Sequence, residues 1–238
     1  MQFEDDGYII NLRKHGENSL ILTVLSQNHG KVTGYVKNCL HKKNLALFQL
    51  GNHVHVDAYS RVDENMLSLK VELLEASSVN FFSDIQKIAC LSSFCELSNA
   101  TMPELFPLES FFNTINNFFN FINEDNWIYY YCCFEFYLLD MLGIGLDLSE
   151  CAATQRTDNL AYVSPKSGKA VCEEAGNLYK DKLFLYPHFI IHENTHPNKE
   201  EVKALLQMTE FFLNKNFFRT HGLKFPQNRD NLLSQLEL

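Results

Sequence analysis

The chain has 238 residues, 46% of them hydrophobic, which is enough for one large globular domain or two modest ones with substantial cores. No apolar run approaches the roughly 20 residues of a membrane-spanning helix, and the first residues lack the basic and apolar parts of a signal peptide. Seven cysteines, an odd number, are scattered among apolar residues, as is typical of free thiols in a reducing compartment. We therefore expect a cytoplasmic protein with no membrane segment.

The net charge of −9 argues at first against binding to nucleic acid, but the charges are unevenly distributed. Residues 13–56 contain six basic residues and one acidic residue, Glu17, so this window is +5 and the rest of the chain is −14. Five of the nine histidines also fall in the window, where they can add positive charge at mildly acidic pH. A local cationic surface on an acidic protein can bind phosphates. Lysines that only keep exposed strands hydrated would produce the same pattern.

The first third of the chain predicts β-structure. Short runs rich in Ile, Leu, Val and Tyr are separated by turn residues at 14–18 and 27–30. The expected strands cover residues 7–13, 19–26, 31–37, 53–59 and 67–73. Val54, Val56 and Ala58 lie on one face of their strand, and Leu67, Leu69, Val71 and Leu73 lie on one face of theirs. Five strands joined only by loops suit a small closed barrel, and an OB-fold is the most economical choice. The longest loop, 38–50, is expected near the binding face.

OB barrels bind single strands of nucleic acid through a cationic groove and aromatic side chains on which bases stack. Phe48 lies in an apolar run and is better explained as core, whereas Tyr35 and Tyr59 could serve either purpose. The candidate DNA-binding residues are Arg13, Lys14, Lys31, Tyr35, Lys37, Lys42, Lys43 and Tyr59.

The rest of the chain predicts helices. Ser83 with Gln86 has the pattern of a capping box that opens a helix reaching about residue 99. An apolar stripe at helical spacing runs from Leu108 to Ile122, and residues 126–142 are apolar nearly all round, as in a helix buried at a domain centre. A further stripe covers 202–217 after a helix start at 197–201, and Asp230 is placed to cap a short last helix.

Between these helices the sequence becomes irregular. Gly143 and Gly145 end the central helix, and residues 162–164 and 169–172 flank a turn at 165–168, which predicts a hairpin. Cys151 and Cys172 each stand where a zinc ribbon would begin a C-x-x-C knuckle, but the second cysteine of each knuckle is missing. Two thiolates would leave zinc under-coordinated, so we expect an insert held by packing, with these two cysteines close in space.

The sequence offers no enzymatic signature. It contains no Gly-rich phosphate loop, no H-E-x-x-H and no G-x-S-x-G. Cys151 with His188 or His192 would make a thiol–imidazole pair, but nothing in the spacing selects these residues from the many cysteines and histidines. We therefore expect a protein that is not an enzyme.

Several short segments, in this order and at these distances, together resemble RecO proteins over essentially the whole chain. They are residues 7–10, 17–22, 30, 37, 47–51, 134–135, 138–139, 142–143, 147–151 and 162–168. The resemblance implies a multidomain α+β protein with an N-terminal OB-fold domain at 1–79 and a helical domain at 80–238. It also implies a zinc-ribbon-like insert at about 147–190 within the helical domain.

By the same resemblance, the chain is expected to be a recombination mediator of the RecF pathway. Such proteins bind single- and double-stranded DNA, contact the C-terminal tail of the single-strand-binding protein, partner with RecR, anneal strands and help to load RecA. Binding the acidic, apolar-ended tail requires a cation beside an apolar pocket, and the candidates are Arg156, Lys166 and Lys169. The incomplete knuckles depart from the family's zinc site, so no cofactor is expected, and Asn38 replaces a glycine that many members have. The alternative is an adaptor that binds protein partners only.

Overall fold

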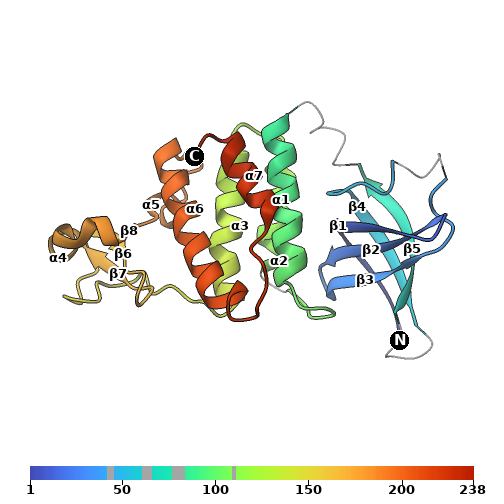
Figure 1. Ribbon diagram of the computed structural model, residues 1–238, viewed down its shortest axis with the longest axis horizontal. Coiled ribbons are helices and arrows are strands. Elements are labelled where there is room, and N and C mark those ends of the chain that lie inside the picture. The colour runs from blue at the N-terminus through green and yellow to red at the C-terminus, as the bar shows by residue number, and fades with distance from the viewer. Residues whose placement is uncertain (42–45, 61–65, 77–83, 109–110) are drawn as a thin grey trace. The chain divides into compact units, whose positions relative to one another are not determined.

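The computed structural model describes residues 1–41, 46–60, 66–76, 84–108 and 111–238. Its N-terminal part is a closed barrel in which neighbouring strands follow the order β1-β2-β3-β5-β4 (Figure 1). The barrel confirms the predicted OB-like fold, although β1 is longer than the sequence indicated. The strands are β1 (Gln2–His15), β2 (Ser19–Ser26), β3 (Gly30–Val36), β4 (His53–Tyr59) and β5 (Leu67–Glu75).

Alternating apolar residues fill the barrel, because successive side chains of a strand point to opposite faces. Val54, Val56 and Ala58 are buried as predicted, and Phe48 also belongs to this core. Leu73 is predicted to share one face with Leu67 and Leu69, but it is 42% exposed whereas those two residues are buried. The pairing of β5 with β3 covers a single short stretch near the start of β5, so the end of β5 pairs with β4 alone and its residues extend past the closed part of the barrel.

The chain forms two compact units, residues 1–119 with 226–237, and residues 120–225 with 238. The first unit combines the barrel with α1 (Ile85–Thr101), most of α2 (Phe111–Phe121) and α7 (Gln227–Gln235). The side chain of Asp84 caps α1 by accepting from the N–H groups of Gln86 and Lys87. The predicted cap, Ser83, lies outside the described residues. The boundary at residue 79 between two domains stays a prediction.

Helix α7 packs along α1 within the first unit. The Glu96 carboxylate accepts a hydrogen bond from the backbone N–H of Asn228 at 2.7 Å, at the start of α7. The Gln86 side chain donates to the carbonyl of Gln235 at 2.9 Å, at the end of α7. Helix α7 begins at Gln227, three residues before Asp230. The prediction that Asp230 caps this helix was wrong, because Asp230 lies within its first turn.

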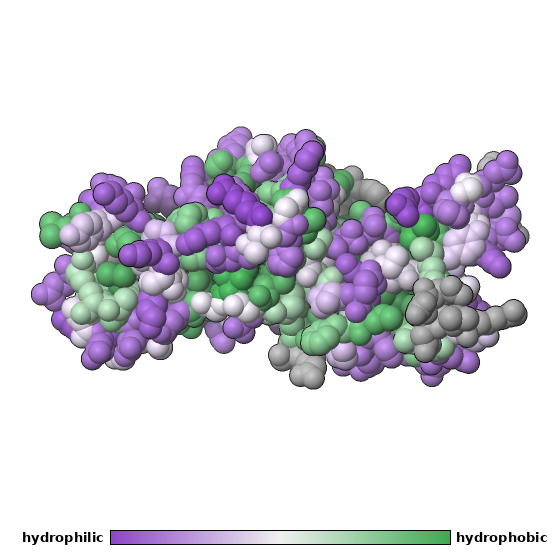
Figure 2. Space-filling model, turned by 60° about the horizontal axis from the view of Figure 1, so that its bottom comes forward, coloured by the Kyte–Doolittle hydropathy of each residue, from purple (hydrophilic) through white to green (hydrophobic). Residues whose placement is uncertain are grey.

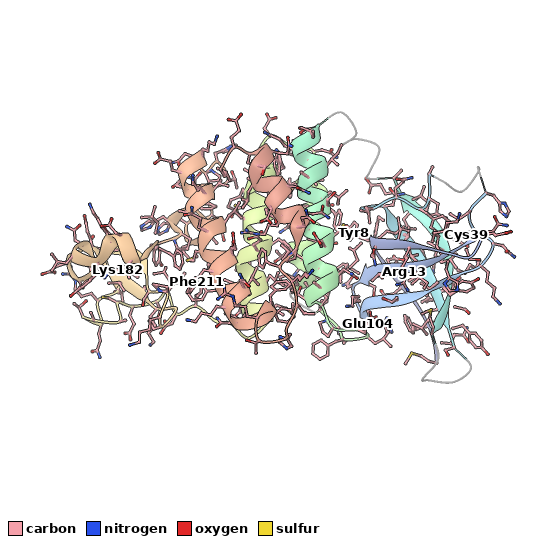
Figure 3. The ribbon with its side chains drawn as sticks, viewed as in Figure 1. Tyr8, Arg13, Cys39, Glu104, Lys182 and Phe211 are labelled. Carbon is pink, nitrogen blue, oxygen red and sulfur yellow. The ribbon has the colours of Figure 1, made fainter. Side chains whose placement is uncertain are left out.

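One end of the outer surface of β1, β2 and β3 is covered by other parts of the same unit. The ring of Tyr8 stacks on that of Phe119 with centroids 3.9 Å apart. The backbone of Lys31 pairs with Glu104, and the N–H of Leu105 donates to the Lys31 carbonyl at 2.9 Å. Figure 3 shows Tyr8 at the end of the barrel beside the helices and Arg13 farther along the strand. We call the part of this surface around Tyr8 and Lys31 the covered end.

The second unit is built on α3 (Trp127–Met141) and α6 (Lys199–Leu213), which pack against each other. Most residues of α3 are buried, as its sequence predicted, whereas Tyr137 and Asp140 are exposed. The carboxylate of Glu135, fully buried on α3, accepts hydrogen bonds from the hydroxyls of Tyr131 and of Thr209 on α6. Asn198 and Glu201 form a capping box at the start of α6, within the predicted region.

An insert follows α3. The predicted hairpin is present as β6 (Leu160–Val163) and β7 (Ala170–Cys172), and β6 pairs on its other side with β8 (Phe184–Leu185), which the sequence did not indicate. The connecting helical turns are α4 (Glu173–Gly176), η3 (Asn177–Lys182) and α5 (His188–Ile191), and a π-helical turn, η4 (Asn214–Phe218), follows α6. On the face shown in Figure 2, hydrophobic and hydrophilic side chains are intermixed over the insert, at the left end of the view.

Candidate nucleic-acid interface

At the end of the barrel surface opposite the covered end, three side chains form a row across three strands. Arg13 pairs with Ile21 across β1 and β2, and Ile21 pairs with Tyr35 across β2 and β3. Arg13 is exposed, Tyr35 is half-buried, and Ile21 lies buried between them. The row combines a cation, an apolar side chain and an aromatic ring, the groups that OB barrels use to bind single strands. We call these three residues the open row.

A β-bulge places Arg13 in this row. Tyr8 and Arg13 are five residues apart, so in a regular strand their side chains would point to opposite faces of the sheet. The register of β1 against β2 shifts between Ile9 and Asn11. An extra residue in one strand changes the alternation beyond it. Arg13 is therefore exposed on the same outer surface as Tyr8, while the following register keeps Leu22 in the core.

Further polar and aromatic groups lie close to the open row. Lys14 follows Arg13 in β1, and Lys37 follows the last residue of β3; both are exposed. The ring of His15 meets that of Tyr35 edge-on with centroids 5.4 Å apart, which restricts the orientation of the tyrosine ring. The structure therefore places four of the predicted DNA-binding residues, Arg13, Lys14, Tyr35 and Lys37, at one end of the barrel.

Tyr59 lies farther around the barrel. Tyr35 pairs with Ser68 of β5, and Ser68 pairs with Tyr59 of β4, so Tyr59 is two strands away from Tyr35. Its side chain is 48% exposed, and Met66, just before β5, is 56% exposed. Sequence reasoning did not single out Met66. Its signal was its position in the sequence directly after the polar residues 61–65, which lie outside the described residues.

Lys31 differs from the other predicted cations. Its ammonium group donates to the carbonyl oxygen of Asn99 at 3.0 Å and lies 3.6 Å from the Glu104 carboxylate. Only 13% of its side chain is exposed. These contacts hold Lys31 at the covered end, away from the open row. Lys42 and Lys43 lie outside the described residues.

The side of the barrel formed by β1 and β4 is acidic. Glu4 pairs with Asp57 and Asp6 with His55, which puts three carboxylates around one imidazole. The Asp6 carboxylate accepts a hydrogen bond from His55 Nδ1 at 2.6 Å and raises the pKa of this histidine. Glu4, His55 and Asp57 have ligand atoms within 4.8 Å of one another, a geometry compatible with a metal ion. Clusters of exposed acidic groups are also common in proteins that bind no metal ion there. The negative charge of these carboxylates would repel phosphates from this side of the barrel.

The second unit contains a small pocket that fits the predicted chemistry of a protein-binding site. It has a volume of about 170 Å³ and lies between the turn after α3, the hairpin turn and the end of α6. Lys166 and Lys215 line it together with Phe212 and Leu146. Lys215 donates to the carbonyl oxygen of Pro165 at 3.1 Å and lies over the Phe211 ring, whereas Lys166 is exposed. Lys215 is a residue that sequence reasoning missed, because its helix stripe indicated only packing.

The other two predicted cations of the insert are already paired. Arg156 contacts Asp158 at 2.7 Å and Glu174 at 3.4 Å, and Lys169 contacts Asp147 at 2.9 Å. All of these groups are largely exposed, so the pairs contribute little to stability but neutralise the cations locally. Lys166 is the predicted cation that the structure brings to the pocket.

The two half-knuckle cysteines come together, as the sequence predicted. Cys151 and Cys172 are both buried, and the backbone N–H of Cys172 donates to the sulfur of Cys151 at 3.2 Å. They belong to a small apolar cluster with Leu160 and Ala170. The zinc-ribbon-like character of the insert stays a prediction.

Comparison with known proteins gives one consistent result. The pattern of the family described as "Recombination protein O N terminal" matches residues 1–77, and that of "Recombination protein O C terminal" matches residues 82–223. The chain is 35% identical over 241 residues to the "DNA repair protein RecO" of Wolbachia sp. subsp. Drosophila simulans (strain wRi), covering 98% of this chain and 100% of the relative. It is 34% identical over 246 residues to the protein of that name from Bartonella bacilliformis, covering 100% and 97%. Within the described part of the chain, every helix is too short or too polar to span a membrane.

Proposed function

The chain belongs to the RecO family of DNA repair proteins, and on that premise we propose that it acts as a non-catalytic mediator of recombination that binds DNA on its barrel. The general role in recombination repair follows from the family. The location of the DNA, the protein partners and the annealing activity are the proposal. The proposal also includes a cytoplasmic location, where the chromosome lies.

The open row is the observation that carries the DNA-binding proposal. Arg13, Lys14 and Lys37 present exposed cations at the end of the barrel where the half-buried Tyr35 offers an aromatic surface. Contacts of this kind neutralise phosphates without reading the base sequence, so affinity should fall steeply with salt. Stacking on an aromatic ring favours unpaired bases over a duplex.

Annealing follows from the same surface without a catalytic residue. Two complementary strands repel each other through their phosphates, and a cationic surface that binds both lowers this repulsion. The acidic side of the barrel around Glu4, Asp6 and Asp57 would keep the strands at the open end. Bases held by weak stacking remain able to leave the protein and pair with each other.

The pocket lined by Lys166, Lys215 and Phe212 supports contact with the tail of the single-strand-binding protein. An acidic peptide that ends in an apolar residue could place that residue against Phe212 and its carboxylates near the two lysines. A mediator that binds both this tail and DNA would act on single strands that are covered by the single-strand-binding protein. Partnership with RecR and loading of RecA rest on the family alone.

The DNA proposal is tested by fluorescence anisotropy of a labelled single-stranded oligonucleotide across a salt series. The variant Arg13→Gln/Lys37→Gln should weaken binding and make the slope of log K against log salt shallower by about two. Lys70→Gln is the matched control, because Lys70 is an exposed cation on β5 that is paired with Glu72 and Asp57. If the wild type does not bind at low salt, the adaptor that binds only proteins becomes the better explanation.

The pocket is tested with a labelled acidic peptide that ends in phenylalanine. Lys166→Glu should weaken binding by at least tenfold, about 1.4 kcal/mol, because it places a negative charge beside the peptide carboxylates. Lys180→Glu, an exposed site on η3 outside the pocket lining, is the control. Equal losses in both variants would point to general electrostatic attraction rather than to this pocket.

A further inference from the structure

The insert contains a cluster of hydrogen bonds around one sulfur atom that the proposed function does not use. The sulfur of Cys151 accepts from the backbone N–H groups of Cys172, Ala153 and Thr154 and from the Thr154 hydroxyl. The same hydroxyl lies 3.5 Å from the sulfur of Cys172. Both cysteines are excluded from solvent, at 0% and 1% exposure, whereas Thr154 is exposed, so its hydroxyl reaches the two sulfurs from the surface of the insert.

The residues involved stand at the positions of two C-x-x-C knuckles, whose zinc-ribbon form remains the prediction made from the sequence. At the first of these knuckles the sulfur of Cys151 accepts from the N–H groups of Ala153 and Thr154, the third and fourth residues of the knuckle. Thr154 stands at the fourth position of the first knuckle. Ala175 stands at the fourth position of the second knuckle and packs against the cluster that contains Cys151 and Cys172. Three of the four positions are therefore joined by their sulfur and hydroxyl groups, and the fourth packs against the same cluster.

The groups at these positions do not fit zinc. A structural zinc site uses four nitrogen or sulfur ligands in a tetrahedron. Here the four positions supply two thiols, one hydroxyl and one methyl group. In the part of the chain that the structure describes, Glu4, His55 and Asp57 form the one group of three or more potential ligands, and they lie on the barrel. No third ligand of this kind joins the two cysteines.

We propose that Thr154 takes the place of a metal ion in this insert, because its hydroxyl joins the two sulfurs and lets the insert fold without metal. The Thr154 hydroxyl is hydrogen-bonded to the sulfur of Cys151 and lies within hydrogen-bond distance of the sulfur of Cys172, so one side chain connects both halves. The proposal does not depend on the proposed function, since it concerns how the insert folds.

The ionisation of Cys151 agrees with this geometry. Burial alone would raise its pKa, but the hydrogen bonds from the Thr154 hydroxyl and from the backbone N–H groups of Cys172, Ala153 and Thr154 outweigh burial and lower the pKa to about 6. A sulfur that accepts this many hydrogen bonds is stabilised as a thiolate, as metal-bound sulfurs are. Packing supplies the rest of the cohesion, with the Tyr186 hydroxyl donating to the Leu148 carbonyl at 3.0 Å across the cluster.

The first experiment restores the missing ligands. The full-length wild type and the double variant Thr154→Cys/Ala175→Cys are purified from zinc-supplemented cells, and their metal content is measured by mass spectrometry. The variant should hold about one zinc per chain, as four thiolates require, and should show cobalt(II)–thiolate absorption after exchange. The wild type should hold none, and a chelator should leave its thermal unfolding midpoint unchanged. A stoichiometric zinc in the wild type, or a midpoint lowered by the chelator, would overturn the proposal.

The second experiment does not depend on the double variant folding. Hydrogen exchange of residues 147–190 is compared among the wild type, Thr154→Val and Thr154→Ser. Valine has the shape of threonine without its hydroxyl and should accelerate exchange in this segment at least tenfold, whereas serine keeps the hydroxyl and should stay near the wild type. Equal exchange in wild type and Thr154→Val would show that packing alone holds the insert and that the hydroxyl has no such role.

Discussion

Lys31 and Lys37 are the same residue type at the two ends of one strand, yet the structure gives them different environments. Lys31 is 13% exposed in its side chain and is held by Asn99 and Glu104. Lys37 is exposed next to the open row. Charge counting along the sequence treats the two as equal. Their comparison shows that a cation is available to a ligand only where the rest of the fold leaves its charge uncompensated.

The tyrosines of the same surface repeat this contrast. Tyr8 is buried at the covered end and stacks on Phe119. Burial raises its pKa to about 12, with a further contribution from Glu75. Tyr35 is half-buried at the open row, with its ring edge against His15. The covered end is thus expected to respond to mutation in stability and the open row in binding, and the following predictions test that division.

The largest effect is expected for Gly30→Ala at the covered end. Gly30 has φ +67°, and a Cβ atom there would collide with the backbone carbonyl of Phe106. The free energy of unfolding, measured by urea denaturation, should fall by about 3 kcal/mol. Gly16→Ala is the matched control, because Gly16 has φ +66° with nothing near its Cβ position. It should cost about 1 kcal/mol, the strain of the backbone conformation alone. Equal losses would show that Phe106 does not restrict Gly30.

A smaller loss is expected for Asp5→Asn, which removes a buried carboxylate from the turn beside the covered end. Asp5 accepts hydrogen bonds from the backbone of Asn28 and His29 at 2.9 and 3.1 Å and contacts the His29 ring at 2.8 Å. Burial raises its pKa, but these bonds outweigh burial, so the pKa in the folded protein is lower than in the unfolded chain. The variant should lose about 2 kcal/mol at neutral pH.

The pH dependence of this loss follows from the sign of the shift. A carboxyl with a lowered pKa stabilises the fold above its unfolded value of about 3.9, and this contribution disappears as the pH falls through the folded value. The difference in stability between wild type and Asp5→Asn should therefore be constant from pH 7 to about 5 and should shrink below about pH 4. A difference that stays constant down to pH 2.5 would contradict the assignment.

At the open row, Tyr35→Leu should weaken binding of single-stranded DNA by about tenfold, because one stacked base loses its aromatic partner. The salt slope should stay unchanged, since no charge is removed. Anisotropy titrations at several salt concentrations measure both quantities. Tyr59→Leu, two strands away, is the comparison that shows how far the binding surface extends. An unchanged affinity in Tyr35→Leu would remove stacking from the proposal.

The smallest effects are expected for the two lysines, and they should be of opposite kinds. Lys31→Met keeps the apolar stem but loses the hydrogen bond to Asn99, so the unfolding free energy should fall by about 1 kcal/mol while the salt slope of DNA binding stays the same. Lys37→Met should leave stability within about 0.5 kcal/mol of the wild type. Its salt slope should become shallower by about one. The reverse pattern would contradict the division into a covered end and an open row.

The sequence alone determined the local elements of this protein. Alternation of apolar residues predicted the barrel strands, the apolar sequence of α3 predicted that most of this helix is buried, and the order of short motifs identified the family. These features depend on neighbouring residues and their spacing, which a sequence displays directly. The approach of Cys151 to Cys172 was also predicted, from the positions of the two cysteines at the starts of two incomplete knuckles, and the Cys172 N–H donates to the Cys151 sulfur.

The tertiary structure decided which of the candidate side chains remain available. A single bulge near Ile9 moved Arg13 to the outer surface. The ammonium group of Lys31 forms a hydrogen bond with Asn99, which lies more than 60 residues farther along the chain. The tertiary structure also brought Lys215 beside Lys166, and Thr154 between two sulfurs. A register shift of one residue reverses the direction of every later side chain, and contacts between distant segments leave no periodic signal in the sequence. Only the tertiary structure shows which cations form hydrogen bonds and ion pairs within the protein and which are exposed to a partner.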